Sequence, residues 1–88
     1  MANTILRVRS VTMKRGRSRS AHYLDIQNGL FTRPVKIGAR AVGWPGDEVE
    51  ILNAARIAGK TEDEIRSLVA MLHGRRKASV TVLSGEVE

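Results

Sequence analysis

The hydrophobic pattern at the start of the chain predicts a short extended segment and then a brief helix. Leu6 and Val8 alternate with basic residues, as they do in an extended segment. Ser10 is placed to cap a helix over residues 11–15, and Gly16 is placed to end it.

A second short helix is predicted after a turn that contains glycine. Ser18 is a favoured N-cap residue for a helix that runs to about Gln27, where Asn28 and Gly29 close it. Two short helices joined by a three- or four-residue turn with glycine are typical of a helix-turn-helix. We therefore expect a recognition helix over about residues 18–28.

The segment after the second helix predicts a β-hairpin over about residues 35–44. Pro34 interrupts the helix, and residues 35–37 and 41–44 form two short runs around a turn at 38–40. Alternation would turn four side chains toward the core: Val35, Ile37, Val42 and Trp44. We interpret Trp44, the only tryptophan, as a packing anchor rather than a base-stacking platform.

Two more helices are predicted in the second half. Asp47 and Glu50 have capping-box spacing for a helix to about Ala58, and Thr61 with Glu64 repeats that spacing. The last helix then carries an amphipathic stripe of Ile65, Leu68, Val69 and Leu72.

This last helix is expected to stop at Gly74. Residues 1–74 then form one domain, and residues 75–88 form a basic and then flexible tail in which residues 80–83 fit either a strand or a disordered segment. The predicted fold class is mainly α with a small β-hairpin, a winged helix-turn-helix with C-terminal helices.

Basic residues are concentrated in the first half of the chain. Residues 1–44 carry nine Lys or Arg against one acid, Asp25, for a formal charge of +8. Residues 45–88 carry six against eight, for a charge of −2. This asymmetry favours a polyanion-binding half, and the alternative is a simple effect on solubility.

Side chains that donate hydrogen bonds share one face of the second helix: Arg19, Ser20, Tyr23 and Gln27. His22, Ile26 and Leu30 share another face, which we expect to turn inward. The first face is a candidate surface for double-stranded DNA.

Individual roles follow from side-chain chemistry. Arg17 and Arg19 can neutralise phosphates or read guanine, Gln27 can read adenine, and Ser18 with the helix N-terminus can hold a phosphate. Lys36 and Arg40 flank the hairpin turn as a basic wing, and Arg33 is a candidate for the DNA backbone. The alternative for each residue is a solvated surface side chain, which we prefer for Gln27 taken alone.

Catalytic and metal chemistry find little support. The chain contains no G-x-G-x-x-G, P-loop, H-E-x-x-H or G-x-S-x-G motif, and it has no cysteine. His22 and His73 lie far apart, and the acids at 62–64 fit the first turn of a helix. We expect no enzyme activity, no cofactor and no metal. With no leader-like or membrane-length apolar run, we also expect a cytoplasmic, nucleoid-associated protein without a membrane partner.

Several blocks in order resemble the AlpA family of prophage regulatory proteins: Gly16-Arg17-Ser18-Arg19-Ser20 with Tyr23, Gly29-Leu30-Phe31, Pro34-Val35-Lys36-Ile37-Gly38, Arg40-Ala41-Val42-Gly43-Trp44 and Glu48-Val49. The resemblance spans about residues 6 to 58 and, through a similar extension, reaches residue 77. It implies a winged helix-turn-helix similar to excisionase and MerR DNA-binding domains, acting in transcriptional control of prophage or mobile-element genes. It places Ser18, Arg19, Ser20 and Tyr23 in the major groove and Lys36 and Arg40 on the wing.

Two positions depart from this family pattern. Arg17 stands where the family is usually apolar, and His22 stands where it is usually apolar or β-branched. Arg17 is expected to add a phosphate contact, whereas a polar ring on the inward face would change how the helix packs.

Four functions stay open at this stage. The first is a sequence-specific transcriptional regulator, and the second is an excisionase-like architectural factor that bends DNA for an integrase. The third is a protein-interaction module whose basic half is incidental, and RNA binding is a further alternative. A module of this size usually contacts one half-site, so we expect a dimer or multimer on DNA.

Overall fold

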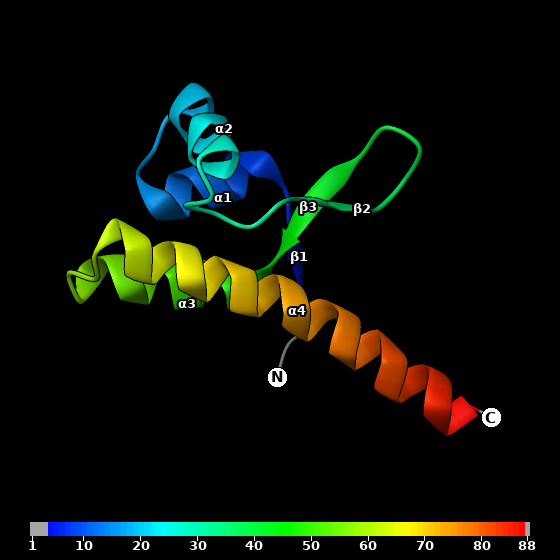
Figure 1. Ribbon diagram of the computed structural model, residues 1–88. Coiled ribbons are helices and arrows are strands. Elements are labelled where there is room, and N and C mark those ends of the chain that lie inside the picture. Colours follow the sequence, from blue (N-terminus) through cyan, green and yellow to red (C-terminus); the bar gives the residue numbers. More distant parts are fainter. Residues whose placement is uncertain (1–3, 88) are drawn as a thin grey trace.

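Figure 1 shows the computed structural model, which describes the backbone of residues 4–87 and the side chains of residues 4–77. Four helices and three short strands make up this described part. In chain order they are β1 (Ile5–Leu6), α1 (Val8–Arg15), α2 (Arg19–Gln27), β2 (Val35–Lys36), β3 (Val42–Pro45), α3 (Gly46–Ile57) and α4 (Glu62–Val87).

α1 is longer than the sequence predicted. It begins at Val8 rather than Val11, so Ser10 lies inside the helix and Arg7 takes the N-cap position without a side-chain cap. The N–H of Val11 donates to the Arg7 carbonyl at 3.0 Å, and Val11 is fully buried. Val8 also packs against the core, which extends the helix toward the N-terminus.

The turn between α1 and α2 forms as predicted. Gly16 ends α1 in the left-handed conformation at φ 68°, which glycine adopts without steric cost. The Ser18 hydroxyl accepts a hydrogen bond from the Ala21 N–H at 3.1 Å and so caps α2. The helix then ends at Gln27, with Asn28 as its C-cap.

The three strands form one antiparallel sheet in the order β1-β3-β2. The hairpin is confirmed, but the expected alternation of its side chains is wrong. Val35 pairs with Gly43, and Lys36 pairs with Val42, so Val35 shares a face with Gly43 rather than with Val42 and Trp44. Ile37 lies near Gly43 and is 44% exposed, whereas Trp44 is fully buried.

α3 starts without the predicted capping box. Its first residue is Gly46, its N-cap is Pro45, and no side chain caps it. The Gly46 N–H instead donates to the carbonyl of Thr4 at 2.8 Å. Backbone from the start of the chain therefore satisfies one of the free donors at this helix end.

α4 begins as predicted and ends much later than predicted. The Thr61 N–H donates to Glu64 at 2.8 Å, and the Glu64 N–H donates to the Thr61 hydroxyl at 3.1 Å, which completes a capping box. The helix does not stop at Gly74. Its backbone continues to Val87, so the strand expected as one alternative for residues 80–83 is wrong. Within the described residues, neither α4 nor any other helix is both long enough and apolar enough to cross a bilayer.

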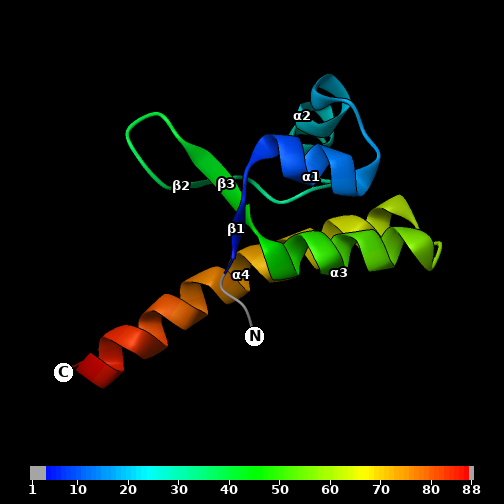
Figure 2. The same ribbon diagram turned by 180° about the vertical axis from the view of Figure 1, so that it is seen from behind.

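The core lies between the helix-turn-helix, the sheet and the α3–α4 pair. Its buried apolar residues are Val11, Leu30, Phe31, Trp44, Val49, Leu52, Ala55, Ile65, Val69 and Leu72. In both views α2 and the β2–β3 loop stand on one side of the molecule and α3 with α4 on the other (Figures 1 and 2). This arrangement is a helix-turn-helix with a β-hairpin wing.

Candidate nucleic-acid interface

The outward face of α2 carries the four side chains that the sequence assigned to it. Arg19, Ser20 and Gln27 are exposed, and Tyr23 is partly buried against the core. The Arg19 guanidinium carbon lies 5.9 Å from the centre of the Tyr23 ring, within cation–π range. The structure therefore gathers these four side chains on one face of α2.

One further residue of this face, Leu24, was not predicted from the sequence. Leu24 is 54% exposed, and it lies one helical turn from both Ser20 and Gln27. The signal in the sequence is helical spacing, because Leu24 falls between Ser20 and Gln27, two polar residues already assigned to this face. The face therefore offers an apolar contact as well as hydrogen bonds.

The inward face of α2 also follows the prediction. His22 is fully buried, and Ile26 packs partly against the core. Leu30, which lies after the end of α2, is 6% exposed. This burial fixes which side of α2 points away from the protein.

The basic wing stands on the same side of the molecule as α2 (Figure 2). Lys36 and Arg40 are both exposed, and the Ile37 N–H donates to the Ala41 carbonyl at 2.9 Å to close the loop between them. The hairpin tip therefore presents its cations to solvent beside the helix.

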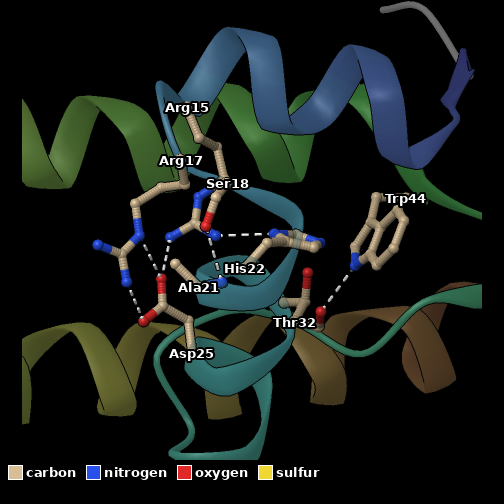
Figure 3. Close-up of polar contacts among 8 residues, drawn as sticks. All are labelled: Arg15, Arg17, Ser18, Ala21, His22, Asp25, Thr32 and Trp44. Atoms are coloured by element: carbon tan, nitrogen blue, oxygen red, sulfur yellow. Dashed lines mark hydrogen bonds and ion pairs between the residues drawn. The ribbon is translucent and has the colours of Figure 1, made fainter.

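Arg17 is engaged in a contact that the sequence analysis did not foresee (Figure 3). Its Nε and Nη2 atoms donate to the two carboxylate oxygens of Asp25 at 3.1 and 2.9 Å. The Arg17 side chain is 43% exposed, so it borders solvent while its guanidinium is held by α2. This contact braces the turn against α2.

Arg15 completes this cluster from the end of α1. Its side chain is 5% exposed, and its Nη2 donates to Asp25 at 2.7 Å. Its guanidinium carbon also lies 4.1 Å from the centre of the Phe31 ring. Burial acts to raise the pKa of Asp25, but the hydrogen bonds from Arg15 and Arg17 outweigh it and leave that pKa below its ordinary value. In the sequence, Asp25 is the single acid among residues 1–44. This isolation is the signal that could have identified it as a structural partner of the arginines.

His22 occupies the centre of the cluster. Its Nδ1 accepts a hydrogen bond from Nη1 of Arg15 at 2.8 Å, which assigns the ring proton to Nε2. The rings of Phe31 and Trp44 lie edge-on at 5.0 and 4.7 Å. Burial, assisted by the charge of Arg15, lowers the pKa of His22 to about 4, so the ring is neutral at neutral pH.

Trp44 ties the wing to the segment that follows α2. Its indole N–H donates to the Thr32 carbonyl at 2.8 Å, and both residues are fully buried. Its ring also lies 6.1 Å from that of Tyr23. The interpretation of Trp44 as a packing anchor is confirmed, and this anchor sets the position of the wing relative to α2.

Arg33 lies at the base of the wing, where α4 holds its backbone. Its N–H donates to Nε2 of His73 at 3.0 Å, and its carbonyl accepts from Arg76 at 2.8 Å. Arg76 also donates to both carboxylate oxygens of the buried Glu48. The Arg33 residue itself is exposed, beside these contacts.

The described residues contain no group of three histidine, cysteine or acidic side chains arranged to hold a metal ion. They present instead an exposed helix face with a basic hairpin beside it. This combination defines a winged helix-turn-helix protein.

Residues 4–53 match the model of the family described as the prophage CP4-57 regulatory protein (AlpA). The chain belongs to this family, as its motif order predicted. No curated protein and no solved structure matches it.

Proposed function

We propose that this protein is a sequence-specific DNA-binding regulator of prophage or mobile-element genes. In the proposed complex α2 enters the major groove and the β2–β3 loop meets the adjacent backbone or minor groove. The observation that carries the proposal is that Arg19, Lys36 and Arg40 are exposed and belong to α2 and the β2–β3 hairpin. These two elements stand on one side of the fold (Figures 1 and 2). The family match and the formal charge of +8 over residues 1–44 support it.

The side chains of α2 divide into positioning and reading groups. Ser18 and the helix N-terminus hold a phosphate, and the Tyr23 hydroxyl donates a hydrogen bond to the DNA backbone. Arg19 reads guanine or neutralises a phosphate, and Gln27 reads adenine. Leu24 supplies an apolar contact of the kind that recognises a thymine methyl group.

The remaining cations contribute to affinity rather than to sequence reading. Lys36 and Arg40 neutralise phosphates beside the recognition helix, and Arg33 does so at the base of the wing. Arg17 adds positive charge near the backbone while its guanidinium stays on Asp25. Binding as a dimer or multimer on repeated half-sites accounts for how so small a module gains affinity.

Selection of binding sites from a random duplex pool tests this proposal. We expect the wild-type protein to select one short motif. If Arg19 reads guanine, Arg19→Ala should weaken binding to that motif by about 1–3 kcal/mol and relax the sequence specificity at one base pair. For Lys36→Ala and for Arg40→Ala we expect a uniform loss across sequences and a salt slope reduced by about 0.9 each.

Lys60→Ala is the matched control, because Lys60 is an exposed cation beyond the end of α3. It should leave both the motif and the salt slope unchanged. Equal affinity for all sequences would remove the sequence-specific part of the proposal, and an absence of retardation on any duplex at low salt would remove DNA binding altogether.

A further inference from the structure

A cavity of about 430 Å³ lies between the end of α1, the turn before α2 and the end of α3. Its volume falls in the range of pockets that hold small molecules. Its charged lining residues are Lys14, Arg15, Arg17, Arg56, Asp25 and Glu62. None of the base-reading roles proposed above uses this cavity.

The walls of the cavity carry more positive than negative charge. Four of the charged residues are cations and two are acids. Asp25 is already shared by Arg15 and Arg17, and Glu62 lies 3.7 Å from Arg66, which does not line the cavity. Across the described residues, the side chains of Lys14 and Arg56 form no ion pair with a carboxylate. The cation excess is therefore not compensated within the described fold.

The same crowding of cations acts on the most buried member of the group. Burial lowers the pKa of Arg15, and the charges of Arg17 and Arg56 lower it further, although Asp25 opposes them. Like charges held together in a partly enclosed space cost free energy, and a bound anion would relieve that cost.

The cavity also has an apolar wall. Leu30 lines its inner side, and Ile57 stands on its rim with 86% of its surface exposed. Ile57 is the last residue of α3, and no described core contact accounts for its apolar side chain. A ligand with an uncharged body next to its anionic group would cover this side chain.

We propose that this cavity binds a small phosphorylated molecule. The phosphate group lies on Lys14 and Arg56, since guanidinium and ammonium groups bind phosphate through charge-assisted hydrogen bonds. It lies beside Arg17, whose guanidinium stays on Asp25. The uncharged body of the molecule lies on Leu30 and Ile57. Apart from Arg17, whose charge serves both proposals, the cavity uses none of the residues assigned to DNA, so either assignment can fail without the other.

The test uses inorganic phosphate and phenyl phosphate as probes in an NMR titration of the full chain at constant ionic strength. Both probes should produce saturable shifts at Lys14, Arg17 and Arg56, and phenyl phosphate should bind more tightly. Lys14→Ala/Arg56→Ala should weaken both on the order of ten-fold or more. Ile57→Ser should remove the advantage of phenyl phosphate, because only the apolar contact is lost.

Arg9→Ala/Lys60→Ala removes two exposed cations that do not line the cavity and should leave both affinities unchanged. Equal loss in this control, or shifts that do not saturate, would overturn the proposal in favour of general charge attraction. Shifts produced at these residues by a 20-base-pair duplex but by neither probe would also overturn it, because the phosphate would then belong to the DNA backbone. The Arg19→Ala experiment reports on the recognition helix independently of all these outcomes.

Discussion

The cluster beneath α2 shows how one acid organises several polar side chains in a small interior. Asp25 accepts hydrogen bonds from both Arg15 and Arg17, and Arg15 also donates to His22. A buried charge is tolerated when it is paired and hydrogen-bonded, and Asp25 meets both conditions. The unusual Arg17 and His22 of this chain are therefore accommodated by the same contacts.

Stability should depend on pH through His22. Its pKa is lowered from 6.5 to about 4 on folding, so between these values the unfolded chain binds more protons than the folded one. The contribution is complete above pH 6.5 and decreases as the pH falls toward 4. We expect the free energy of unfolding, measured in urea, to decrease by about 2 kcal/mol between pH 7 and pH 5.

His22→Asn keeps an acceptor near Arg15 but removes the titrating ring, so it should flatten this pH dependence even if it lowers stability overall. His73, whose pKa is lowered by burial and then by Arg33 and Arg76, adds a dependence of the same sign. NMR titration separates the two rings. A His22 ring that titrates near pH 6.5 in the folded protein would contradict its assigned environment.

Removing Asp25 should be far more damaging than removing Arg17. Asp25→Asn leaves the buried Arg15 charge without its carboxylate, which should lower the free energy of unfolding by about 3–5 kcal/mol. Arg17→Ala leaves the Arg15 pair intact and removes a partly exposed contact, so it should cost at most about 1 kcal/mol. Denaturant unfolding measures both, and similar losses would show that the cluster is not held by the Arg15 pair.

At the level of elements, helix ends were predictable where the signal is local. Gly16, Ser18 and the Thr61–Glu64 box act through neighbours within a few residues, and each forms as expected. The start of α3 and the end of α4, in contrast, depend on distant partners. Thr4 satisfies the start of α3, and ion pairs from α3 hold α4 after Gly74, so no local pattern could reveal them.

Two glycines differ in what an added Cβ atom would contact, so their alanine variants should change stability in opposite directions. Gly74 lies inside α4 without a positive φ, and a Cβ there would meet nothing within 4 Å. Gly74→Ala should therefore raise the free energy of unfolding by up to about 1 kcal/mol.

Gly43→Ala is the opposite case, because its Cβ would lie 2.5 Å from Cγ2 of Ile5 and 2.9 Å from the carbonyl of Leu6. It should destabilise by about 1–3 kcal/mol, since the clash involves backbone of the neighbouring strand. Thermal unfolding of the two variants ranks them. A destabilising Gly74→Ala would show that α4 bends at this residue in solution.

The candidate interface follows the same rule: its local features were predictable from the sequence, and its tertiary contacts were not. Helical spacing alone assigned Arg19, Ser20, Tyr23 and Gln27 to one face, and the hairpin signal brought Lys36 and Arg40 beside it. The contact of Arg17 with Asp25 was not predictable, because it depends on the angle between α1 and α2. The side-chain alternation of the hairpin failed for a related reason, since only the strand register decides which face each residue takes.

For the whole molecule, Arg76 joins three parts of the chain. It reaches from α4 to Glu48 in α3 and to the Arg33 carbonyl just before the wing. Glu48 is 2% exposed, so its charge depends on this partner. The C-terminal helix thereby supports the base of the wing as well as the core.

Arg76→Ala should lower the free energy of unfolding by about 3 kcal/mol, because it leaves the buried Glu48 carboxylate unpaired. Arg75→Ala removes the neighbouring pair with Asp47, in which both side chains are nearly half exposed, and should cost less than about 1 kcal/mol. Equal stability of the two variants in denaturant would show that Glu48 finds another partner.

The position of Trp44 has a practical consequence. As the sole tryptophan, fully buried and bonded to Thr32, it makes the protein its own fluorescent reporter at the junction of helix, loop and hairpin. Loss of that junction would move the indole into water and shift its emission to longer wavelength. Docking of the hairpin can thus be followed in solution without attaching any dye.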